Sequence, residues 1–343
     1  MIAAVLLAIV VATIVATGLV RRFAIARTLL DVPTSRSSHT TPVPRGGGLA
    51  FVVTILAALI VLAAFGIIDR PLTLAIVPSG IAVAAVGWLD DRQGLSRGVR
   101  ILVHAGAAAW ILWWLGPVAE LRLGDSALAL GWFAWPLSLL GLVWLANAFN
   151  FMDGIDGIAA GTAVVAGAIG AILCAAAGAS GPAWFAAVIA AGALGFLPWN
   201  WAPAKIFMGD VGSVFLGLLL GAAGLAADHT GAVPAPLWAL LLGPFLFDAT
   251  LTLIRRMVRG EPWRSAHRSH AYQRAVQSGL GHGAVTSWVL VLNGIIAGLV
   301  AWGVAHPRFQ AAVVVAGVAL LAAAYFAVER RRPMTLQEPA AKA

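Results

Sequence analysis

The residues best suited to chemistry lie in one stretch, residues 144–157, which reads WLANAFNFMDGIDG. Four polar side chains recur there at intervals of three, where one long apolar segment ends and the next begins: Asn147, Asn150, Asp153 and Asp156. Asp156 could cap the following helix, and Asp153 with Gly154 could form the turn, but neither role explains the asparagines. Carboxylates and carboxamides beside a bilayer are costly unless they serve a function. The stretch therefore predicts a site.

Two adjacent carboxylates, Asp90 and Asp91, end another apolar run in the sequence GWLDDR. Such a pair can hold Mg²⁺, which takes one or two carboxylates together with water and substrate phosphates. Alternatively, one acid acts as a base while the other orients a metal. A solvated helix end is the structural explanation, but acids at a helix C-terminus oppose the macrodipole. A functional role is therefore favoured.

Asp210 lies in PWNWAPAKIFMGDVGS, at the mouth of a further apolar run. It could cap backbone N–H groups of that helix or ligate a metal, and a helix N-terminus also favours anions such as phosphate. Lys205 and Asn200 are close in sequence, as a lysine and a donor that face a phosphate would be. Asp210 is therefore a candidate metal ligand beside a candidate phosphate site.

Two loops supply cationic side chains. The first, residues 31–48, has prolines that forbid a regular helix and three glycines that allow close backbone approach, and Arg45 lies beside them. The second, residues 255–283, holds six arginines and three histidines. Arginine binds diphosphate bidentately, although a basic loop attracted to anionic lipid is the alternative. A zinc pair at His267 and His270 is a weak reading, because no cysteine is near.

The composition identifies an integral membrane protein. Of 343 residues, 61% are hydrophobic and 10% are charged, and the mean hydropathy is +0.93, whereas soluble domains carry about a quarter charged residues. The net charge of +8 would suggest nucleic acid in a soluble protein, but here the location of the charges matters more, and we expect no nucleic-acid partner. The single cysteine, Cys174, cannot form an intramolecular disulfide.

Eleven apolar runs are long enough to be transmembrane helices. They cover about residues 2–20, 47–68, 71–89, 99–116, 131–149, 158–178, 183–198, 211–228, 235–254, 285–304 and 309–328. The predicted fold is therefore all-α and polytopic. We expect one transmembrane domain, residues 1–330, followed by a short cytoplasmic tail, residues 331–343.

The distribution of basic residues predicts the orientation. Nineteen of the 22 Lys and Arg residues fall on one side of the eleven-span arrangement, and only Arg70, Arg122 and Arg308 fall on the other. The positive-inside rule places the richer side in the cytoplasm, so the N-terminus is periplasmic and the C-terminus cytoplasmic. The candidate acids then lie at the cytoplasmic helix ends, where a divalent metal and a phosphorylated lipid substrate are the economical explanation.

Two other classes of membrane protein account for less. A transporter of an anionic substrate would place ionisable groups near the midplane and show repeated halves, but the acids lie at helix ends and no repeat is evident. An intramembrane aspartyl protease would need a GxGD motif, but position 207 is Phe207. The transporter is kept as the alternative function.

The motifs, taken in order, resemble those of a known family. GGGLAF, GWLDD, NAFNFMDGIDGIAAG, FMGDVGS and the histidine-bearing last loop, over about residues 31–283, look like the polyprenyl-phosphate N-acetylhexosamine-1-phosphate transferases of glycosyltransferase family 4. The last loop lacks the adjacent histidines of the related phospho-MurNAc-pentapeptide translocase. It is more similar to the branch that initiates O-antigen and capsule synthesis (WecA-like and WbpL-like enzymes).

The resemblance implies an enzyme of the bacterial inner membrane. Such an enzyme moves a sugar-1-phosphate from a UDP-sugar to undecaprenyl phosphate on the cytoplasmic face, with Mg²⁺ or Mn²⁺, and releases UMP. The lipid-linked sugar then initiates O-antigen, lipopolysaccharide or another cell-envelope polysaccharide. The sequence does not indicate the sugar, the direct or covalent course of the reaction, or the oligomeric state, for which a homodimer stays open.

The resemblance also implies residue roles. The catalytic set is Asp90, Asp91 and Asp210, the metal set is Asp210, Asp91 and Asn150, and the substrate-binding residues are Asn147, Asn150, Asp153, Asp156, His267 and His270. The cationic side chains of the loops, Arg45, Lys205, Arg264 and Arg274, complete the predicted substrate-binding set. Asp90 would assist the lipid phosphate. Because the second pKa of a phosphate monoester is about 6, that phosphate is mostly dianionic at neutral pH, and Asp90 positions it more than it deprotonates it.

Overall fold

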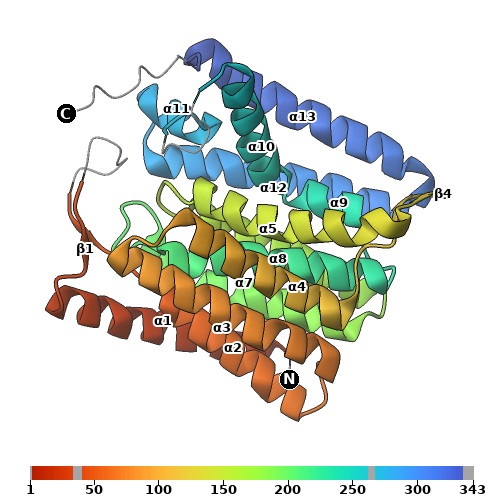
Figure 1. Cartoon of the computed structure of the whole chain (residues 1–343), viewed down its shortest axis with the longest axis horizontal. Helices are drawn as coiled ribbons and strands as arrows, with labels where there is room; N and C mark the ends of the chain where they lie inside the picture. Colours follow the sequence, from red (N-terminus) through yellow and green to blue (C-terminus); the bar gives the residue numbers. More distant parts are fainter. Residues whose placement is uncertain (1, 34–40, 262–266, 335–343) are drawn as a thin grey trace.

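The computed structural model describes residues 2–33, 41–261 and 267–334, most of them helical (Figure 1). The helices are α1 (Ile2–Ala26), α2 (Gly48–Ala64), α3 (Arg70–Gln93), α4 (Arg97–Leu115), α5 (Ala134–Met152), α6 (Ile158–Ala176), α7 (Ser180–Asn200), α8 (Asp210–His229), α9 (Ala235–Leu241), α10 (Gly243–Val258), α11 (Ala271–Gln277), α12 (His282–Ala305) and α13 (Gln310–Arg331), with short 3₁₀ turns at Gly131–Phe133 and Pro307–Phe309. The predicted all-helical class is confirmed.

The predicted apolar runs correspond closely to these helices. Within the described residues, nine helices are long and apolar enough to cross a membrane, while α2 is a shorter apolar helix. The predicted run 235–254 differs, because it is two helices, α9 and α10, that meet at an angle of 84°. Pro244 lies in the first turn of α10, and a proline there cannot continue the hydrogen-bond ladder of a preceding helix. The predicted tail, 331–343, lies largely outside the described residues.

Helix α8 lies in the middle of the bundle, and nearly all of its residues from Val211 to Asp228 are buried. It contacts α2, α3, α5, α6 and α7. Small residues make this possible: a Cβ added to Gly217 would lie 2.8 Å from Cα of Ala146 in α5. Between membrane helices, such close packing replaces the hydrophobic drive available in water. The residue that begins α8, Asp210, is thereby held at a fixed place.

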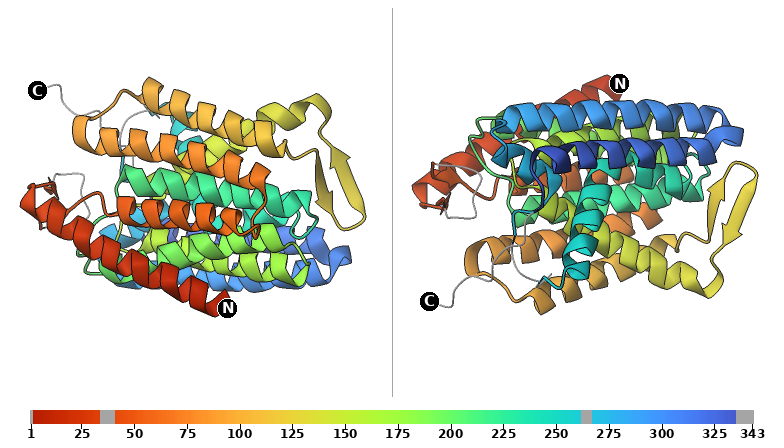
Figure 2. Two further views of the ribbon diagram at one scale, coloured as in Figure 1. Left: turned by 90° about the horizontal axis from the view of Figure 1, so that it is seen from below. Right: turned by 90° about the horizontal axis from the view of Figure 1, so that it is seen from above.

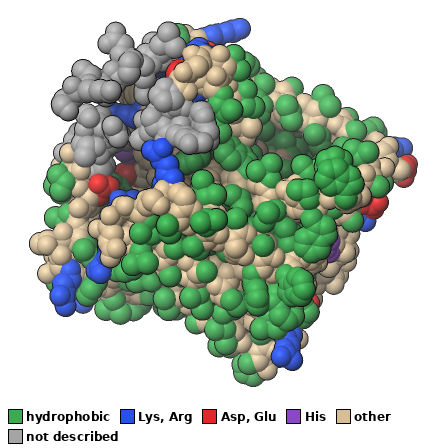
Figure 3. All heavy atoms as spheres, viewed as in Figure 1, with side chains coloured by type: hydrophobic (Ala, Val, Ile, Leu, Met, Phe, Trp, Pro, Cys, Tyr) green, Lys and Arg blue, Asp and Glu red, His purple; other side chains and the backbone are tan. Residues whose placement is uncertain are grey.

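Two small antiparallel hairpins mark opposite ends of the molecule. Strands β1 (Leu30–Asp31) and β2 (Val43–Pro44) pair at one end, and β3 (Glu120–Leu123) and β4 (Ser126–Ala129) form a hairpin at the other. Figure 2 shows the second hairpin projecting beyond the helices. On the face drawn in Figure 3, hydrophobic side chains cover the middle and charged ones lie toward the ends, as expected for a protein surrounded by lipid.

Candidate active site

The polar residues of the first hairpin's end surround a cavity of about 210 Å³. Its walls come from the β1–β2 region, the 153–156 turn, the 207–210 segment and the beginnings of α8, α11 and α12. The lining residues are Asp31, Arg45, Asn150, Asp153, Gly154, Ile155, Asp156, Asn200, Phe207, Met208, Gly209, Asp210, Ser213, Gln273 and His282. Four of the predicted site residues, Asn150, Asp153, Asp156 and Asp210, are therefore brought together with Arg45 in one cavity.

Three long helices begin at this cavity. Asp156 precedes α6, Asp210 is the first residue of α8, and His282 is the first residue of α12. The N-terminal end of a helix carries a partial positive charge of about half a unit and free N–H groups. The cavity is therefore suited to an anion such as phosphate, although carboxylates also border it.

Two arginines pair with the three predicted catalytic acids. Arg45 Nη2 lies 2.8 Å from Asp91 Oδ1 and 3.2 Å from Asp210 Oδ1. Arg100 Nη1 donates to Asp90 Oδ2 over 2.6 Å and lies 3.4 Å from Asp210 Oδ2. Because each arginine touches Asp210, this carboxylate lies at the centre of the charge cluster. The backbone N–H of Leu95 fixes the second oxygen of Asp90 at 2.7 Å.

The structure gives Asp91 a role at the start of α8. Its carboxylate accepts hydrogen bonds from the backbone N–H groups of Asp210 at 3.0 Å and Val211 at 3.4 Å. Gly87 permits this approach, since an added Cβ would lie 2.6 Å from the Val211 nitrogen. Asp91 was predicted as a metal ligand, but it does not line the cavity. Its oxygens are occupied by the helix terminus and by Arg45.

Polar contacts also fix the central stretch. Asn150 Nδ2 donates to Ser213 Oγ at 3.1 Å, which joins α5 to α8. Asp156 accepts from the Ala204 N–H at 3.0 Å through Oδ2, and its Oδ1 lies 3.2 Å from His282 Nδ1. No hydrogen bond or ion pair joins the Asp153 carboxylate to the other described residues. In the part of the chain that the structure describes, Asp153 therefore differs from its neighbours in bordering the cavity without such a partner.

The electrostatics of two side chains follow from this arrangement. Burial and the nearby Asp210 raise the pKa of the Asp153 carboxyl well above its ordinary value, and Arg45 offsets only part of the effect. For Arg45, burial alone would lower the pKa, but the carboxylates of Asp91 and Asp210 outweigh it, so the pKa of Arg45 is raised. The carboxylates thus keep Arg45 charged, whereas Arg45 compensates only in part for the burial of Asp153.

Comparison with known proteins decides the family. The glycosyl transferase family 4 model matches residues 73–228, which include Asp90, Asp91 and Asp210. The chain is 33% identical over 294 residues to a probable undecaprenyl-phosphate N-acetylglucosaminyl 1-phosphate transferase of Bacillus subtilis, covering 82% of this chain and 79% of that one. The chain belongs to the polyprenyl-phosphate hexosamine-1-phosphate transferase family.

Two further relatives bear on the branch of the family. A decaprenyl-phosphate N-acetylglucosaminephosphotransferase of Mycobacterium tuberculosis is 33% identical, with 90% of this chain and 85% of that one covered. A phospho-N-acetylmuramoyl-pentapeptide-transferase of Gloeothece citriformis is 32% identical, but only 62% and 60% of the two chains are covered. The more extensive similarity is thus to enzymes named for N-acetylglucosamine phosphate transfer.

Several residues predicted to bind substrate do not line the cavity of this transferase. Asn147 donates to the Val143 carbonyl at 2.7 Å, and the Lys205 ammonium lies 5.6 Å from the Trp199 ring centre. His270 is buried beside Asp248, and Arg274 is buried and paired with Glu329. His267 lies next to His270, 4.9 Å between ring centres, and Arg264 lies outside the described residues. Their role in substrate binding stays a prediction.

Sequence reasoning missed four residues of the transferase's site. Arg100 binds Asp90 and Asp210, whereas Ser213, Gln273 and His282 line the cavity. Arg100 counted only as a basic residue of a loop, and His282 only as one histidine of the last loop. A signal did exist for Ser213 and His282, since both lie in the first turn of a helix whose N-terminus faces the candidate site.

Proposed function

We propose that this transferase moves an N-acetylhexosamine-1-phosphate from a UDP-sugar to undecaprenyl phosphate and releases UMP. The observation that carries the proposal is the position of Asp210, which begins α8, contacts Arg45 and Arg100, and borders the same cavity as Asp153. A diphosphate needs cations and N–H donors around it, and this cavity supplies both. The transporter alternative has no comparable observation in its favour.

Mg²⁺ or Mn²⁺ is the proposed cofactor. The candidate ligands that border the cavity offer oxygen atoms: Asp210, Asp153 and Asn150. Among the described residues, no three His, Cys, Asp or Glu side chains form a ready metal site. This fits Mg²⁺, which takes one or two protein carboxylates and completes its shell with water and substrate phosphates. When bound, the ion would neutralise charge on the donor diphosphate. Asp153 borders the cavity and has no hydrogen-bond or ion-pair partner among the described residues, which favours Asp153 over Asp91 as a ligand.

The mechanism we favour is direct attack by an oxygen of the lipid phosphate on the β-phosphorus of the UDP-sugar. Arg45 and Arg100 neutralise negative charge that accumulates there. Asp90 is fixed by the Leu95 N–H and pairs with Arg100. In this mechanism Asp90 orients Arg100 and positions the lipid phosphate that attacks. A covalent intermediate on a carboxylate is the competing course, and trapping labelled enzyme with donor alone would favour it.

The membrane arrangement is part of the proposal. The nine long helices, α2, and the bent pair α9–α10 together supply eleven segments. Eleven crossings put the ends of the chain on opposite sides, with the N-terminus periplasmic and the cavity on the cytoplasmic face of the bacterial inner membrane. The supporting observation is that 19 of the 22 Lys and Arg residues fall on one side of the eleven-span arrangement predicted from the sequence, the side that also carries the candidate acids.

The proposal also covers the identity of the donor sugar and of the polysaccharide that is initiated. Relatives named for N-acetylglucosamine favour UDP-N-acetylglucosamine as the first donor to examine. The histidine loop favours initiation of O-antigen, lipopolysaccharide or another cell-envelope polysaccharide over transfer of a muramyl pentapeptide.

The experiment is UMP release by the purified protein in detergent, measured with a panel of UDP-N-acetylhexosamines. Each donor is tested with and without undecaprenyl phosphate and with and without Mg²⁺. We expect release that requires both lipid and metal. Asp210→Asn should abolish it, while Glu120→Gln, which removes an exposed ion pair with Arg122 at the opposite end, should not change it. No release with any donor, together with no metal-dependent UDP-sugar binding, would refute the proposal.

A further inference from the structure

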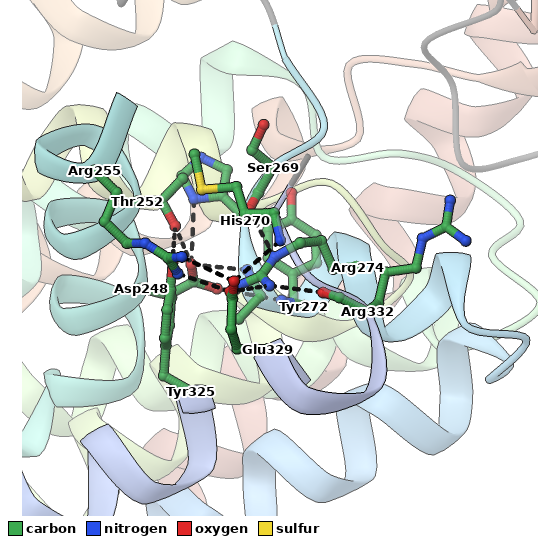
Figure 4. Close-up of polar contacts among 12 residues, drawn as sticks. Asp248, Thr252, Arg255, Ser269, His270, Tyr272, Arg274, Tyr325, Glu329 and Arg332 are labelled. Atoms are coloured by element: carbon green, nitrogen blue, oxygen red, sulfur yellow. Dashed lines mark hydrogen bonds and ion pairs between the residues drawn. The ribbon is translucent and has the colours of Figure 1, made fainter. Parts of the chain in front are cut away.

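A second polar cluster joins α10, α11 and α13 outside the cavity (Figure 4). Its central members are Asp248 in α10, Arg274 in α11 and Glu329 in α13. Buried charges carry a large desolvation cost unless they are paired and hydrogen-bonded. The extensive pairing of these charges therefore points to a structural constraint on the helices that they join.

Asp248 holds the beginning of α11. Its Oδ1 accepts from the Ala271 N–H at 2.9 Å, and its Oδ2 accepts from the Tyr272 N–H at 3.2 Å. The same carboxylate accepts from Thr252 Oγ1 at 2.9 Å and lies 3.4 Å from His270 Nδ1. Asp248, in one of the two helices of the bent pair α9–α10, thus fixes the backbone of α11 and lies beside the ring of a predicted substrate-binding histidine.

Glu329 joins the last long helix to this assembly. It forms a bidentate pair with Arg255, at 2.7 and 2.8 Å, and it also accepts from Arg274. Arg274 in turn donates to the Ser269 carbonyl at 3.0 Å. This hydrogen bond links the two ends of the 269–274 segment to each other, and Arg274 links them to Glu329. Tyr325, one turn before Glu329, contacts Thr252 and Arg255 through its hydroxyl, each at 3.2 Å.

Helix α11 transmits this arrangement to the cavity wall. The Tyr272 hydroxyl donates to the Phe151 carbonyl at 3.0 Å, at the end of α5. Gly154 leaves no room between itself and Tyr272, because an added Cβ would overlap the hydroxyl. Gln273 lines the cavity directly and accepts from the His270 N–H at 3.3 Å. A shift of α11 must therefore move the 151–154 segment and one wall of the cavity.

We propose that Asp248 and Glu329 are positioning residues, which hold α11 so that Tyr272 and Gln273 fix one wall of the cavity proposed to bind the UDP-sugar. The kinetic tests of this proposal depend on the proposed function, whereas the hydrogen-exchange test does not. The last long helix is then a working part of the active site and not only a membrane anchor. Neither acid lines the cavity, and each acts on it through α11.

The first test measures kinetics of Glu329→Gln, which keeps the side-chain shape but weakens the pairs with both arginines. We expect kcat/KM for the UDP-sugar to fall about tenfold or more, chiefly through a higher KM, with KM for the lipid within about twofold of wild type. Glu120→Gln is the matched control, since it removes a charge pair outside the cluster. An unchanged donor KM, or an equal rise in both KM values, would overturn the proposal.

A double-mutant cycle with Tyr272→Phe separates positioning from general destabilisation. If Glu329 acts through α11, the two losses in kcat/KM should be strongly non-additive, because both substitutions free the same contact with Phe151. Additive losses would overturn the proposal. Tyr325→Phe, which removes only the hydroxyl contacts to Thr252 and Arg255, replaces Glu329→Gln in the cycle if that variant does not fold.

Hydrogen exchange tests the inference without reference to the reaction. The backbone N–H groups of Ala271 and Tyr272 donate to the Asp248 carboxylate. Glu329→Gln should increase the hydrogen-exchange rate of these two groups at least tenfold. The control is Ile111→Ala, which removes a fully buried side chain of α4. We choose it because it should lower the melting temperature about as much as Glu329→Gln does. Equal protection of α11 in the Glu329 variant and wild type would overturn the proposal even if transferase activity were absent throughout.

Discussion

At the scale of single residues, neighbours give the acids of the site different tasks. Asp90 and Asp91 each pair with an arginine and accept from backbone N–H groups, so their carboxylates are already satisfied. Asp210 touches both arginines but also borders the cavity. Asp153 borders it without a partner among the described residues. Residue type alone cannot distinguish these tasks, because all four are aspartates in polar motifs.

The different tasks of Asp91 and Asp210 lead to different metal dependence. Asp91→Asn should lower the melting temperature, since it weakens the cap of α8, a contact worth about 1 kcal/mol, but should leave the Mg²⁺ concentration for half-maximal activity within about threefold. Asp210→Asn should raise that concentration more than about tenfold or abolish activity. Titration of Mg²⁺ in the UMP-release assay measures both. A tenfold rise for Asp91→Asn would restore it as a metal ligand.

The raised pKa of Asp153 predicts how pH affects the metal-free protein. Its folded-state pKa lies above the unfolded value, so the native state binds more protons between the two, and stability falls as pH rises through that window. In EDTA, the melting temperature of the wild type should fall as pH rises through this window, and Asp153→Asn should remove that fall. Added Mg²⁺ should stabilise the wild type more as pH rises, because the metal binds the deprotonated carboxylate. The same pH dependence in Asp153→Asn would contradict the assignment.

At the scale of elements, the sequence predicted the helices well and their packing poorly. Runs of about 20 apolar residues must be helical in lipid, so each predicted run has a helix in the structure. The break at Gly243 and Pro244 was readable from the proline. The central position of α8 was not, because every candidate span is apolar, and only the close contacts of Gly212, Gly217 and Gly224 reveal it.

Gly87 provides a test of helix packing at the site. Its added Cβ would lie 2.6 Å from the Val211 nitrogen, a backbone atom that cannot move aside cheaply. Gly87→Ala should therefore separate α3 from α8, take Asp91 away from the start of α8, and lower kcat about a hundredfold while the protein still enters the membrane. Gly98→Ala in α4, where nothing lies within 4 Å, should retain activity. Equal activity of the two variants would show that this close approach is not needed.

At the scale of the whole molecule, the candidate site could be predicted in part. Asn150, Asp153 and Asp156 lie in one motif and Asp210 lies in another, but all belong to helix ends on the same predicted side, so their convergence follows from topology. His270 and Arg274 share that side, yet they are buried against Asp248 and Glu329. Topology gives only the end of the bundle. Which side chains face the cavity depends on the path of α11, which no periodicity in the sequence reveals.

The two ends of the bundle also allow a test of orientation. The native chain has one cysteine, Cys174, which is buried, so a Cys174→Ala background should react little with a membrane-impermeant maleimide. In that background, Asp125→Cys at the exposed β3–β4 turn should be labelled in intact spheroplasts. Gln93→Cys and Arg332→Cys, at the exposed ends of α3 and α13 on the cavity side, should be labelled only after permeabilisation. The reverse pattern would place the cavity outside the cell, where a UDP-sugar made in the cytoplasm could not reach it.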